Sequence, residues 1–192
     1  DHSAHTMTKQ LIATAGIIGI MTATASCRPA PAVVKTPQPT ATASAAPVLP
    51  DSIRWVRDSA EYQAAVLQTY RAATTSVEIA ARSRQPGGWA VVLDADETII
   101  SNQQYQIELA QAGLTHTPER WRAWVGRREA TPLPGAAAFL SRVRDLGGRI
   151  AIVTNRLESE CPDTEAVFKS HRLTYDVMLC RADAGTSDKN PR

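Results

Sequence analysis

The stretch WAVVLDADET at residues 89–98 decides the fold of this chain. Its first half is continuously apolar and rich in β-branched side chains, which predicts a strand that is buried on both faces. Asp94 and Asp96 follow this strand directly. Because side chains alternate in an extended chain, we expect both carboxylates on the same side. Ligands of open parallel sheets bind at the carboxyl ends of the strands, so these acids are the first candidates for a functional site.

Helical and strand-like patterns alternate along the rest of this region. Apolar residues recur every three or four positions after Ser59, and this helical pattern ends before Pro86. Further helices are predicted over 101–112, from Thr117, over 134–147 and over 162–172, and further strands over 149–153 and 175–180. Strands that alternate with helices indicate an α/β fold with a parallel sheet and right-handed crossovers.

Polar side chains also follow the other two predicted strands. Thr154-Asn155-Arg156 follows the second strand and offers hydroxyl and amide donors that suit phosphate oxygens. Past the third strand, Lys189 lies in a polar segment, where a cation can neutralise negative charge in a transition state. Taken singly, Thr154-Asn155 could instead cap a helix, and Lys189 could be a solvated surface residue. Their succession at the strand ends favours one shared site.

The two acids also indicate a metal ion. Neighbouring carboxylates repel each other unless they share a proton or a hard cation such as Mg²⁺ lies between them. A metal would also reduce the repulsion between a phosphate and an attacking Asp94 carboxylate. An acidic pair alone is weak evidence, because such pairs are common in turns. The apolar strand before the pair and Thr98 after it strengthen the interpretation.

The charge balance and the first segment of the chain concern partners and location. The chain has 192 residues, with 21 Lys and Arg against 19 Asp and Glu, so nucleic acid is not an expected partner. Residues 1–6 fit no part of a signal. Residues 7–26 carry a lysine, an apolar run and small residues in the order of a secretory signal. The apolar run is well short of the ~20 residues that a membrane-spanning helix needs.

Thr24-Ala25-Ser26-Cys27 resembles a bacterial lipobox, in which the cysteine is acylated and becomes the first residue of the mature protein. An ordinary cleaved signal with an incidental cysteine is the alternative. Residues 27–50 are rich in Pro, Ala and Thr and are expected to form a disordered tether. We therefore expect an exported domain that starts near Asp51 and is held at the bacterial cell envelope by a lipid on Cys27. In a cell with an outer membrane, that membrane is the expected location.

The residues after the strands carry a family resemblance. DADET after a strand, Thr154-Asn155-Arg156 and the later Lys189 resemble motifs one to three of the haloacid dehalogenase (HAD) superfamily of phosphohydrolases. Over residues 53–192 the chain resembles, more narrowly, the lipoprotein e(P4) family of acid phosphatases and 5′-nucleotidases. That resemblance implies a Rossmann-like three-layer α/β/α fold with a parallel sheet and a small helical cap over about residues 98–134.

The resemblance also implies a reaction and a role for each motif residue. Asp94 would attack phosphorus and form an aspartyl-phosphate, and Asp96 would protonate the leaving alkoxide and then activate water. Thr154 and Asn155 would position the phosphoryl group, and Lys189 would stabilise its charge. Mg²⁺ would be bound by the Asp94 carboxylate and the Asp96 main-chain carbonyl. The implied substrate is a small phosphomonoester, with nucleotides as the expected class.

Three residues of the implied cap are candidates for the walls of a substrate pocket. They are Asn102, Tyr105 and Trp124. The two aromatic rings could hold a nucleobase. Packing within the cap explains these aromatic residues equally well.

The family pattern normally continues with a fourth motif, an acidic pair after another strand. This sequence stops at Arg192, so we expect that strand and its metal ligands to be absent and one sheet edge to be unpaired. Two rival hypotheses therefore stand beside phosphatase activity. The chain could be an inactive fragment, or it could be a non-catalytic surface lipoprotein that uses the fold as a binding module.

The cysteines fit this resemblance. Three cysteines cannot all pair within one chain. If Cys27 carries a lipid, Cys161 and Cys180 remain. In the resembled fold these two lie at the same edge of neighbouring strands, so they can form a disulfide in an oxidising envelope.

Overall fold

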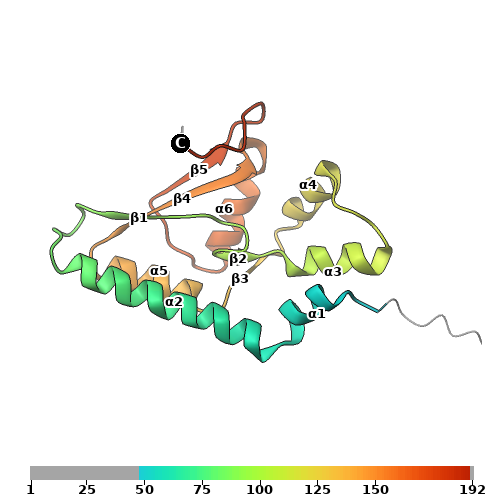
Figure 1. Ribbon diagram of the computed structural model, residues 1–192. Coiled ribbons are helices and arrows are strands. Elements are labelled where there is room, and N and C mark those ends of the chain that lie inside the picture. The colour runs from blue at the N-terminus through green and yellow to red at the C-terminus, as the bar shows by residue number, and fades with distance from the viewer. Residues whose placement is uncertain (1–47, 191–192) are drawn as a thin grey trace, which may run out of the picture. The chain divides into compact units, whose positions relative to one another are not determined.

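The computed structural model describes residues 48–190 (Figure 1). The predicted signal over residues 7–26, Cys27 and most of the tether lie outside the described residues, as do residues 1–6. The helices are α1 (Asp51–Asp58), α2 (Ala60–Ala81), α3 (Gln103–Ala112), α4 (Pro118–Arg127), α5 (Ala136–Asp145) and α6 (Cys161–Ser170), with a short 3₁₀ turn η1 (Glu158–Glu160). The strands are β1 (Ala90–Leu93), β2 (Ile100–Ser101), β3 (Thr131–Pro132), β4 (Arg149–Leu157) and β5 (Val177–Arg181). Within these residues no helix combines the length and the apolar character that crossing a membrane requires.

Three strands form a parallel sheet in the order β1-β4-β5. Val91 pairs with Ile150 in β4, and Ile152 pairs with Met178 in β5. Helices α2 and α5 lie together on one side of the sheet, and α6 lies on the other (Figure 1). This arrangement confirms the expected α/β fold with a parallel sheet between helical layers.

The core lies around β4, the central strand. Ile150 and Ile152 are completely buried and belong to one core cluster with Val143 of α5 and Phe168 of α6, which are completely buried as well. Helix α2 adds a stripe of partly buried residues, namely Val66, Tyr70, Ala73 and Val77. Burial of this apolar area from both sides holds β4 in place, and the carboxyl end of β4 is therefore a firm support for functional side chains.

Strand β1 is less buried than its sequence predicts. Among the described residues it pairs with β4 alone and lies at the edge of the sheet. Ala90 is exposed and Val92 is 67% exposed, whereas Val91 and Leu93 pack against the core. The prediction of a strand buried on both faces is therefore wrong. The described helices cover the face that holds Val91 and Leu93 and leave the other face of β1 open.

Strand β4 is longer than its sequence predicts. The predicted strand ends at Val153, but the observed strand continues through Leu157. Thr154-Asn155-Arg156 therefore lies within the last part of the strand rather than after it. Thr154 and Arg156 are buried and Asn155 is exposed, as expected for side chains that alternate between two faces.

A two-helix insert, made of α3 and α4, lies between β1 and α5. Its base is the antiparallel pair β2 and β3, in which Ile100 is opposite Pro132. Helix α3 ends at Gly113, whose φ of 63° is a left-handed conformation that glycine adopts without steric cost. Helix α4 begins after Thr117, whose hydroxyl accepts a hydrogen bond from Arg120 N. The end of α3 at Ala112 and the start of α4 after Thr117 are where the sequence predicts them.

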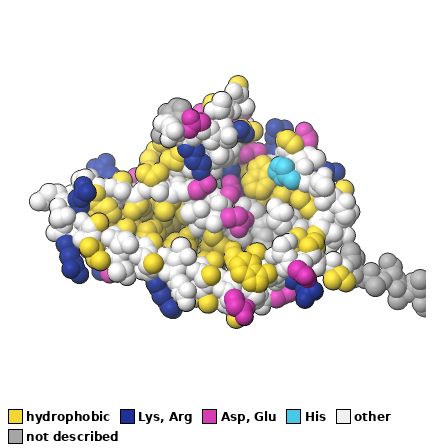
Figure 2. All heavy atoms as spheres, in the orientation of Figure 1, with side chains coloured by type: hydrophobic (Ala, Val, Ile, Leu, Met, Phe, Trp, Pro, Cys, Tyr) yellow, Lys and Arg dark blue, Asp and Glu magenta, His cyan; other side chains and the backbone are white. Residues whose placement is uncertain are grey.

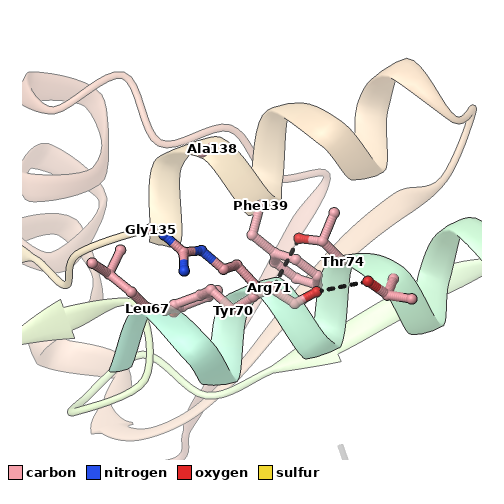
Figure 3. Close-up of a pocket in the computed structure, with 8 residues that line it drawn as sticks. Leu67, Tyr70, Arg71, Thr74, Gly135, Ala138 and Phe139 are labelled. Carbon is pink, nitrogen blue, oxygen red and sulfur yellow. Dashed lines mark hydrogen bonds between the residues drawn. The ribbon is translucent and has the colours of Figure 1, made fainter. Parts of the chain in front are cut away.

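The surface has two hollows near α2. On the face drawn in Figure 2, hydrophobic side chains line a hollow next to a group of acidic side chains. The residues that line the two hollows are as follows. A hollow of about 360 Å³ is lined by residues of α2 and by Leu93 and Glu97. A second hollow, of about 420 Å³, lies between α2 and α5 and is lined by Tyr70, Arg71 and Phe139 among others (Figure 3). None of the predicted catalytic or phosphate-binding residues lines either hollow, but Glu97 and Thr98, which follow the predicted acids, line the first.

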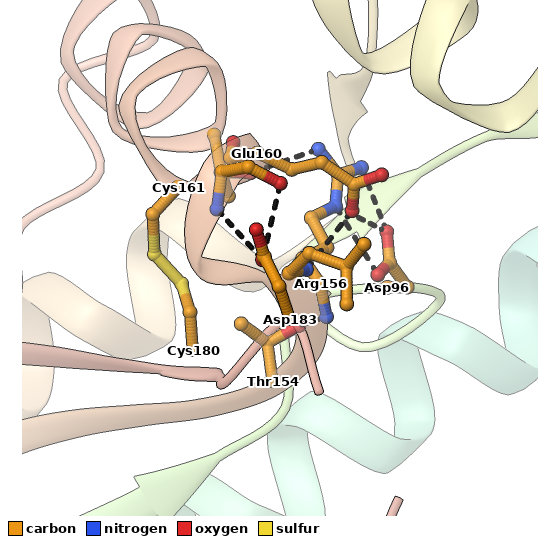
Figure 4. The surroundings of a disulfide bond; sticks show 10 residues. Asp96, Thr154, Arg156, Glu160, Cys161, Cys180 and Asp183 are labelled. Atoms are coloured by element: carbon orange, nitrogen blue, oxygen red, sulfur yellow. Dashed lines mark hydrogen bonds and ion pairs between the residues drawn. A yellow bond between two sulfur atoms is a disulfide. The ribbon is translucent and has the colours of Figure 1, made fainter. Parts of the chain in front are cut away.

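A disulfide joins Cys161, the first residue of α6, to Cys180 in β5, with 6.3 Å between the Cα atoms (Figure 4). Next to it, Ser159 N and Ser159 Oγ each lie 3.1 Å from Asp183 Oδ1. These links tie the start of α6 and the turn before it to β5 and the segment after β5.

Candidate active site

A tight turn after β1 positions the two acids. Ile100 N donates a hydrogen bond to Ala95 O at 3.0 Å, and Glu97 N donates to Ile100 O at 2.8 Å. Glu97 has a φ of 51°, in the left-handed region that few residues other than glycine adopt. Backbone hydrogen bonds therefore impose this conformation and fix where the side chains of Asp94 and Asp96 begin.

The same turn is anchored to α2. The Tyr70 hydroxyl donates a hydrogen bond to Thr98 O. Burial raises the pKa of Tyr70 to about 12, so the hydroxyl keeps its proton and remains a donor near neutral pH. Gly135, at the start of α5, lets this ring approach closely, because a Cβ there would lie 3.1 Å from Tyr70 Cβ. Tyr70 of α2 thus holds the turn through its hydrogen bond, and the start of α5 packs against Tyr70.

Lys189 meets Asp94 at the carboxyl end of β1. Lys189 Nζ lies 2.6 Å from Asp94 Oδ2, and Asp94 Oδ1 accepts a hydrogen bond from Ala95 N at 2.7 Å. The side chains of Lys189 and Asp94 are 34% and 39% exposed, so a ligand can reach both. The structure therefore brings together the carboxylate and the lysine that the sequence predicts for one site.

Asp96 is paired with Arg156 instead (Figure 4). Arg156 Nε lies 3.0 Å from Asp96 Oδ1 and 3.2 Å from Oδ2, and Arg156 Nη2 lies 2.8 Å from Oδ1. The Arg156 side chain is only 1% exposed, against 27% for Asp96. A buried cation is costly unless it has an anion and further hydrogen-bond acceptors. When it is ionised, Asp96 is that anion.

Arg156 also contacts α6 and the two-helix insert. Its Nη1 donates to Thr164 Oγ1 at 3.1 Å, and its Nη2 donates to Asn102 Oδ1 at 3.0 Å. The guanidinium lies over the ring of Trp121, 5.3 Å from the ring centroid, which is a cation–π geometry. The sequence places Arg156 beside the phosphate donors but gives it no role of its own. Its position two residues after Thr154 on a strand, and hence on the same face, is the signal that could have indicated burial.

Asn102 joins this network from the start of α3. Its Nδ2 donates to Asp96 Oδ1 at 2.8 Å, and its Oδ1 accepts from Trp124 Nε1 at 2.8 Å. Its backbone N–H donates to Glu97 Oε1 at 2.7 Å. The side chain is buried, so its carboxamide holds Asp96 and the insert together rather than lining an open pocket.

The aromatic candidates for a substrate wall lie inside the insert. Tyr105 and Trp124 are 3% and 2% exposed. The Tyr105 hydroxyl lies 2.9 Å from His116 Nδ1, and burial raises the pKa of Tyr105. Their burial agrees with packing of the insert. Trp121, which the sequence does not single out, is partly exposed and lies over Arg156, so it is better placed to contact a substrate at the acids.

The predicted phosphate donors lie beside the acids. Leu93 pairs with Ile152 in the sheet, so the residues that follow these two lie at the same edge. Thr154 is completely buried, and its Oγ1 accepts a hydrogen bond from Arg156 N at 3.1 Å. Asn155 is exposed at this edge.

The acids offer ligands of the type that magnesium prefers. Mg²⁺ binds oxygen atoms and is commonly held by one or two carboxylates, with water and substrate phosphate as further ligands. Asp94 and Asp96 provide such carboxylates. Between residues 48 and 190 no group of three or more His, Cys, Asp or Glu side chains is placed to hold a metal ion.

A parallel sheet with acids at the end of its first strand and a helical insert directly after them is the architecture of HAD-type phosphohydrolases. The chain belongs to the HAD superfamily, subfamily IIIB (acid phosphatase), whose family model matches residues 13–190. This result confirms the resemblance that the motifs indicate.

Solved structures agree with this fold. The class C acid phosphatase from Bacillus anthracis with tungstate bound is 24% identical in sequence, with a TM-score of 0.64 over 71% of this chain and 58% of that chain. Another structure of the class C acid phosphatase from Bacillus anthracis gives 24% identity and a TM-score of 0.63, over 69% of this chain and 57% of that chain. At this identity the likeness shows the fold. This chain spans less than two thirds of the length of these relatives.

Proposed function

We propose that the protein is a Mg²⁺-dependent phosphomonoester hydrolase of the acid phosphatase and 5′-nucleotidase type. Membership of subfamily IIIB supports this function. The observation that carries it is the contact between Asp94 and Lys189 at the carboxyl end of β1. This contact gathers a carboxylate and a cation at one accessible point, which is what attack on an anionic phosphate requires.

The proposed reaction has two steps. First, a carboxylate oxygen of Asp94 bonds to phosphorus, the bond from phosphorus to the ester oxygen breaks, and Asp96 gives its proton to the leaving alkoxide. The product is an aspartyl-phosphate at Asp94. Then Asp96 takes a proton from water, the water oxygen bonds to phosphorus, and phosphate leaves as the Asp94 carboxylate is restored. Thr154 and Asn155 position the phosphoryl group, and Lys189 stabilises its charge.

The proposal also includes a magnesium ion with two protein ligands and a class of substrate. The Asp94 carboxylate and the Asp96 main-chain carbonyl would hold Mg²⁺, which when bound reduces the repulsion between phosphate and carboxylate. The proposed substrate is a small phosphomonoester, with nucleotides as the favoured class. The partly exposed ring of Trp121, next to the acids, offers a surface for a base.

The test is phosphate release from AMP, NMN and p-nitrophenyl phosphate by the full-length gene product, with and without Mg²⁺. We expect release that requires Mg²⁺ and that is lost in Asp94→Asn. Asp145→Asn, an exposed acid at the end of α5, is the matched control and should keep full activity. Absence of release from all three substrates would overturn the proposal, and tight binding of a phosphate ester without turnover would favour a binding module.

We also propose that the protein is exported and anchored to the bacterial cell envelope through a lipid on Cys27, at the outer membrane where one exists. The signal-like order of residues 7–26 supports this location. The disulfide between Cys161 and Cys180 supports it as well, because disulfides persist in oxidising compartments. Mass spectrometry of the mature N-terminus tests it, and an unmodified first residue other than Cys27 would contradict it.

A further inference from the structure

The two oxygens of the Asp96 carboxylate are held differently. Asn102 Nδ2 and Arg156 Nη2 each lie 2.8 Å from Asp96 Oδ1, and Arg156 Nε lies 3.0 Å from it. From the same two residues, Oδ2 receives one longer contact, 3.2 Å from Arg156 Nε. An oxygen that already accepts several hydrogen bonds has little capacity left for a proton. Oδ2 is therefore the oxygen of Asp96 that is available for proton transfer.

The donors on Oδ1 have little freedom to move. The Arg156 side chain is 1% exposed and is held at the same time by Asp96, by Thr164 and by the ring of Trp121. The Thr164 hydroxyl is itself fixed, because it donates to Glu160 O at 3.0 Å. A guanidinium with several partners keeps one orientation, since its planar fork is rigid.

The two-helix insert supports the second donor. Asn102 Oδ1 accepts from Trp124 Nε1 and from Arg156 Nη2, so the amide nitrogen of Asn102 must point toward Asp96. The indole of Trp124 is 2% exposed and cannot turn away. The orientation of the Asp96 carboxylate therefore depends on contacts inside the insert.

We propose that Arg156 is a positioning residue for proton transfer by Asp96. Together with Asn102 it saturates Oδ1 and leaves Oδ2 as the oxygen that gives a proton to the leaving group and later takes one from water. This inference rests on the proposed function, in which Asp96 is the general acid and base. It assigns Arg156 a role that is separate from the phosphate binding proposed for Thr154 and Asn155.

A purely structural Arg156 would behave differently in one measurable respect. General acid catalysis matters most when the leaving group is a strongly basic alkoxide, as with AMP, and least when it is a stable phenolate, as with p-nitrophenyl phosphate. Misorientation of Asp96 should therefore slow AMP hydrolysis far more than p-nitrophenyl phosphate hydrolysis. General loosening of the fold should slow both to the same extent.

The experiment compares kcat and KM for these two substrates in the full-length gene product. Arg156→Lys keeps the charge but cannot reach Asp96, Asn102 and Thr164 together. Trp124→Phe keeps an aromatic ring and removes the N–H that orients Asn102. The control is Arg142→Lys, which changes a partly exposed arginine paired with Glu78 across α5 and α2.

For Arg156→Lys we expect kcat for AMP to fall about a hundredfold and kcat for p-nitrophenyl phosphate to fall by about threefold or less, with KM little changed. Trp124→Phe should change the ratio of the two rates in the same direction by about threefold or more. The control should leave the ratio as in the wild type.

Equal losses on both substrates would overturn the inference. If Arg156→Lys does not fold, as judged by thermal unfolding, the ratio in Trp124→Phe decides, and an unchanged ratio overturns the inference. A wild-type protein that hydrolyses neither substrate would instead overturn the proposed function from which this inference starts.

Discussion

Lys189 Nζ lies 2.6 Å from Asp94 Oδ2, so the segment after β5 supplies a cation to the end of β1. Asp96 is paired instead with Arg156 of β4. The two cations differ in access, since the Lys189 side chain is 34% exposed and that of Arg156 is 1% exposed. A phosphate can therefore compete for Lys189, whereas Arg156 stays with its acid.

Lys189→Met should lower kcat for phosphomonoesters by about a hundredfold, because the cation that stabilises charge on the phosphoryl group is removed. Steady-state kinetics on p-nitrophenyl phosphate measures this loss. Lys169→Met, at an exposed position near the end of α6, is the matched control and should keep normal turnover. Normal turnover in Lys189→Met would place the phosphate elsewhere.

The disulfide should contribute to stability. Cys161 and Cys180 are separated by 19 positions, and closing a loop of this size stabilises a fold by about 3 kcal/mol in the chain-entropy model. The double variant Cys161→Ser/Cys180→Ser should therefore unfold at a lower temperature than the oxidised protein. Addition of dithiothreitol should lower the melting temperature of the wild type and leave that of the double variant unchanged. A wild type insensitive to reductant would contradict this expectation.

The ion pair between α3 and α4 should make stability depend on acid pH. Hydrogen bonds from Arg127 and then Gln104 lower the pKa of Glu108 from 4.5 to about 2. Because the pKa is lower in the folded protein, the pair stabilises the fold above about pH 4.5, and this contribution disappears as the pH falls toward about 2.

Glu108→Gln should therefore lower the free energy of unfolding at pH 7, by at most about 1 kcal/mol, because the pair is partly exposed and screened by solvent. Denaturant unfolding at a series of pH values should show this difference shrinking below about pH 4.5. The exposed Glu158→Gln is a control that should show no such trend. A difference that is constant with pH would exclude the ion pair as its cause.

Two glycines should respond in opposite ways to alanine. A Cβ at Gly148 would lie 2.5 Å from Trp89 Cη2, so Gly148→Ala should destabilise the fold by about 1–3 kcal/mol through overpacking. At Gly126 in α4 the nearest atom, Asp163 Oδ2, would be 4.0 Å away. Gly126→Ala should stabilise the protein by about 0.5 kcal/mol or less, because alanine is favoured over glycine in a helix and Gly126 lies in the last turn of α4. Thermal unfolding measures both, and a shift of the same sign would contradict the packing argument.

Local signals predicted much of the fold and part of the site. Ser59 before α2 and Thr117 before α4 are caps whose hydroxyls accept the expected backbone hydrogen bonds. Asp94 and Lys189 were expected at one site because parallel strands bring their carboxyl ends together, and the structure has them in contact. Such inferences need only neighbouring residues and one general rule of sheet topology.

Features that depend on distant partners could not be predicted. The apolar residues of β1 indicate full burial, but burial depends on which strands and helices lie beside the strand, and Val92 is 67% exposed. The charge of Arg156 indicates solvent, yet the side chain is buried because Asp96 neutralises it. Asn102 and Trp124 were candidates for a pocket wall. Only the three-dimensional structure shows that they are hydrogen-bonded to each other.

The open edge of β1 has a consequence for handling the protein. Unpaired backbone groups along a strand are a template for pairing with a strand of another molecule, and exposed apolar side chains promote such pairing. Val92, which is 67% exposed on the open face of β1, adds an apolar side chain beside this edge, so Val92→Lys should reduce any self-association through β1. Two positions of one extended segment would thus have different consequences, Val92 in β1 for association between molecules and Asp94 just after β1 for the chemistry.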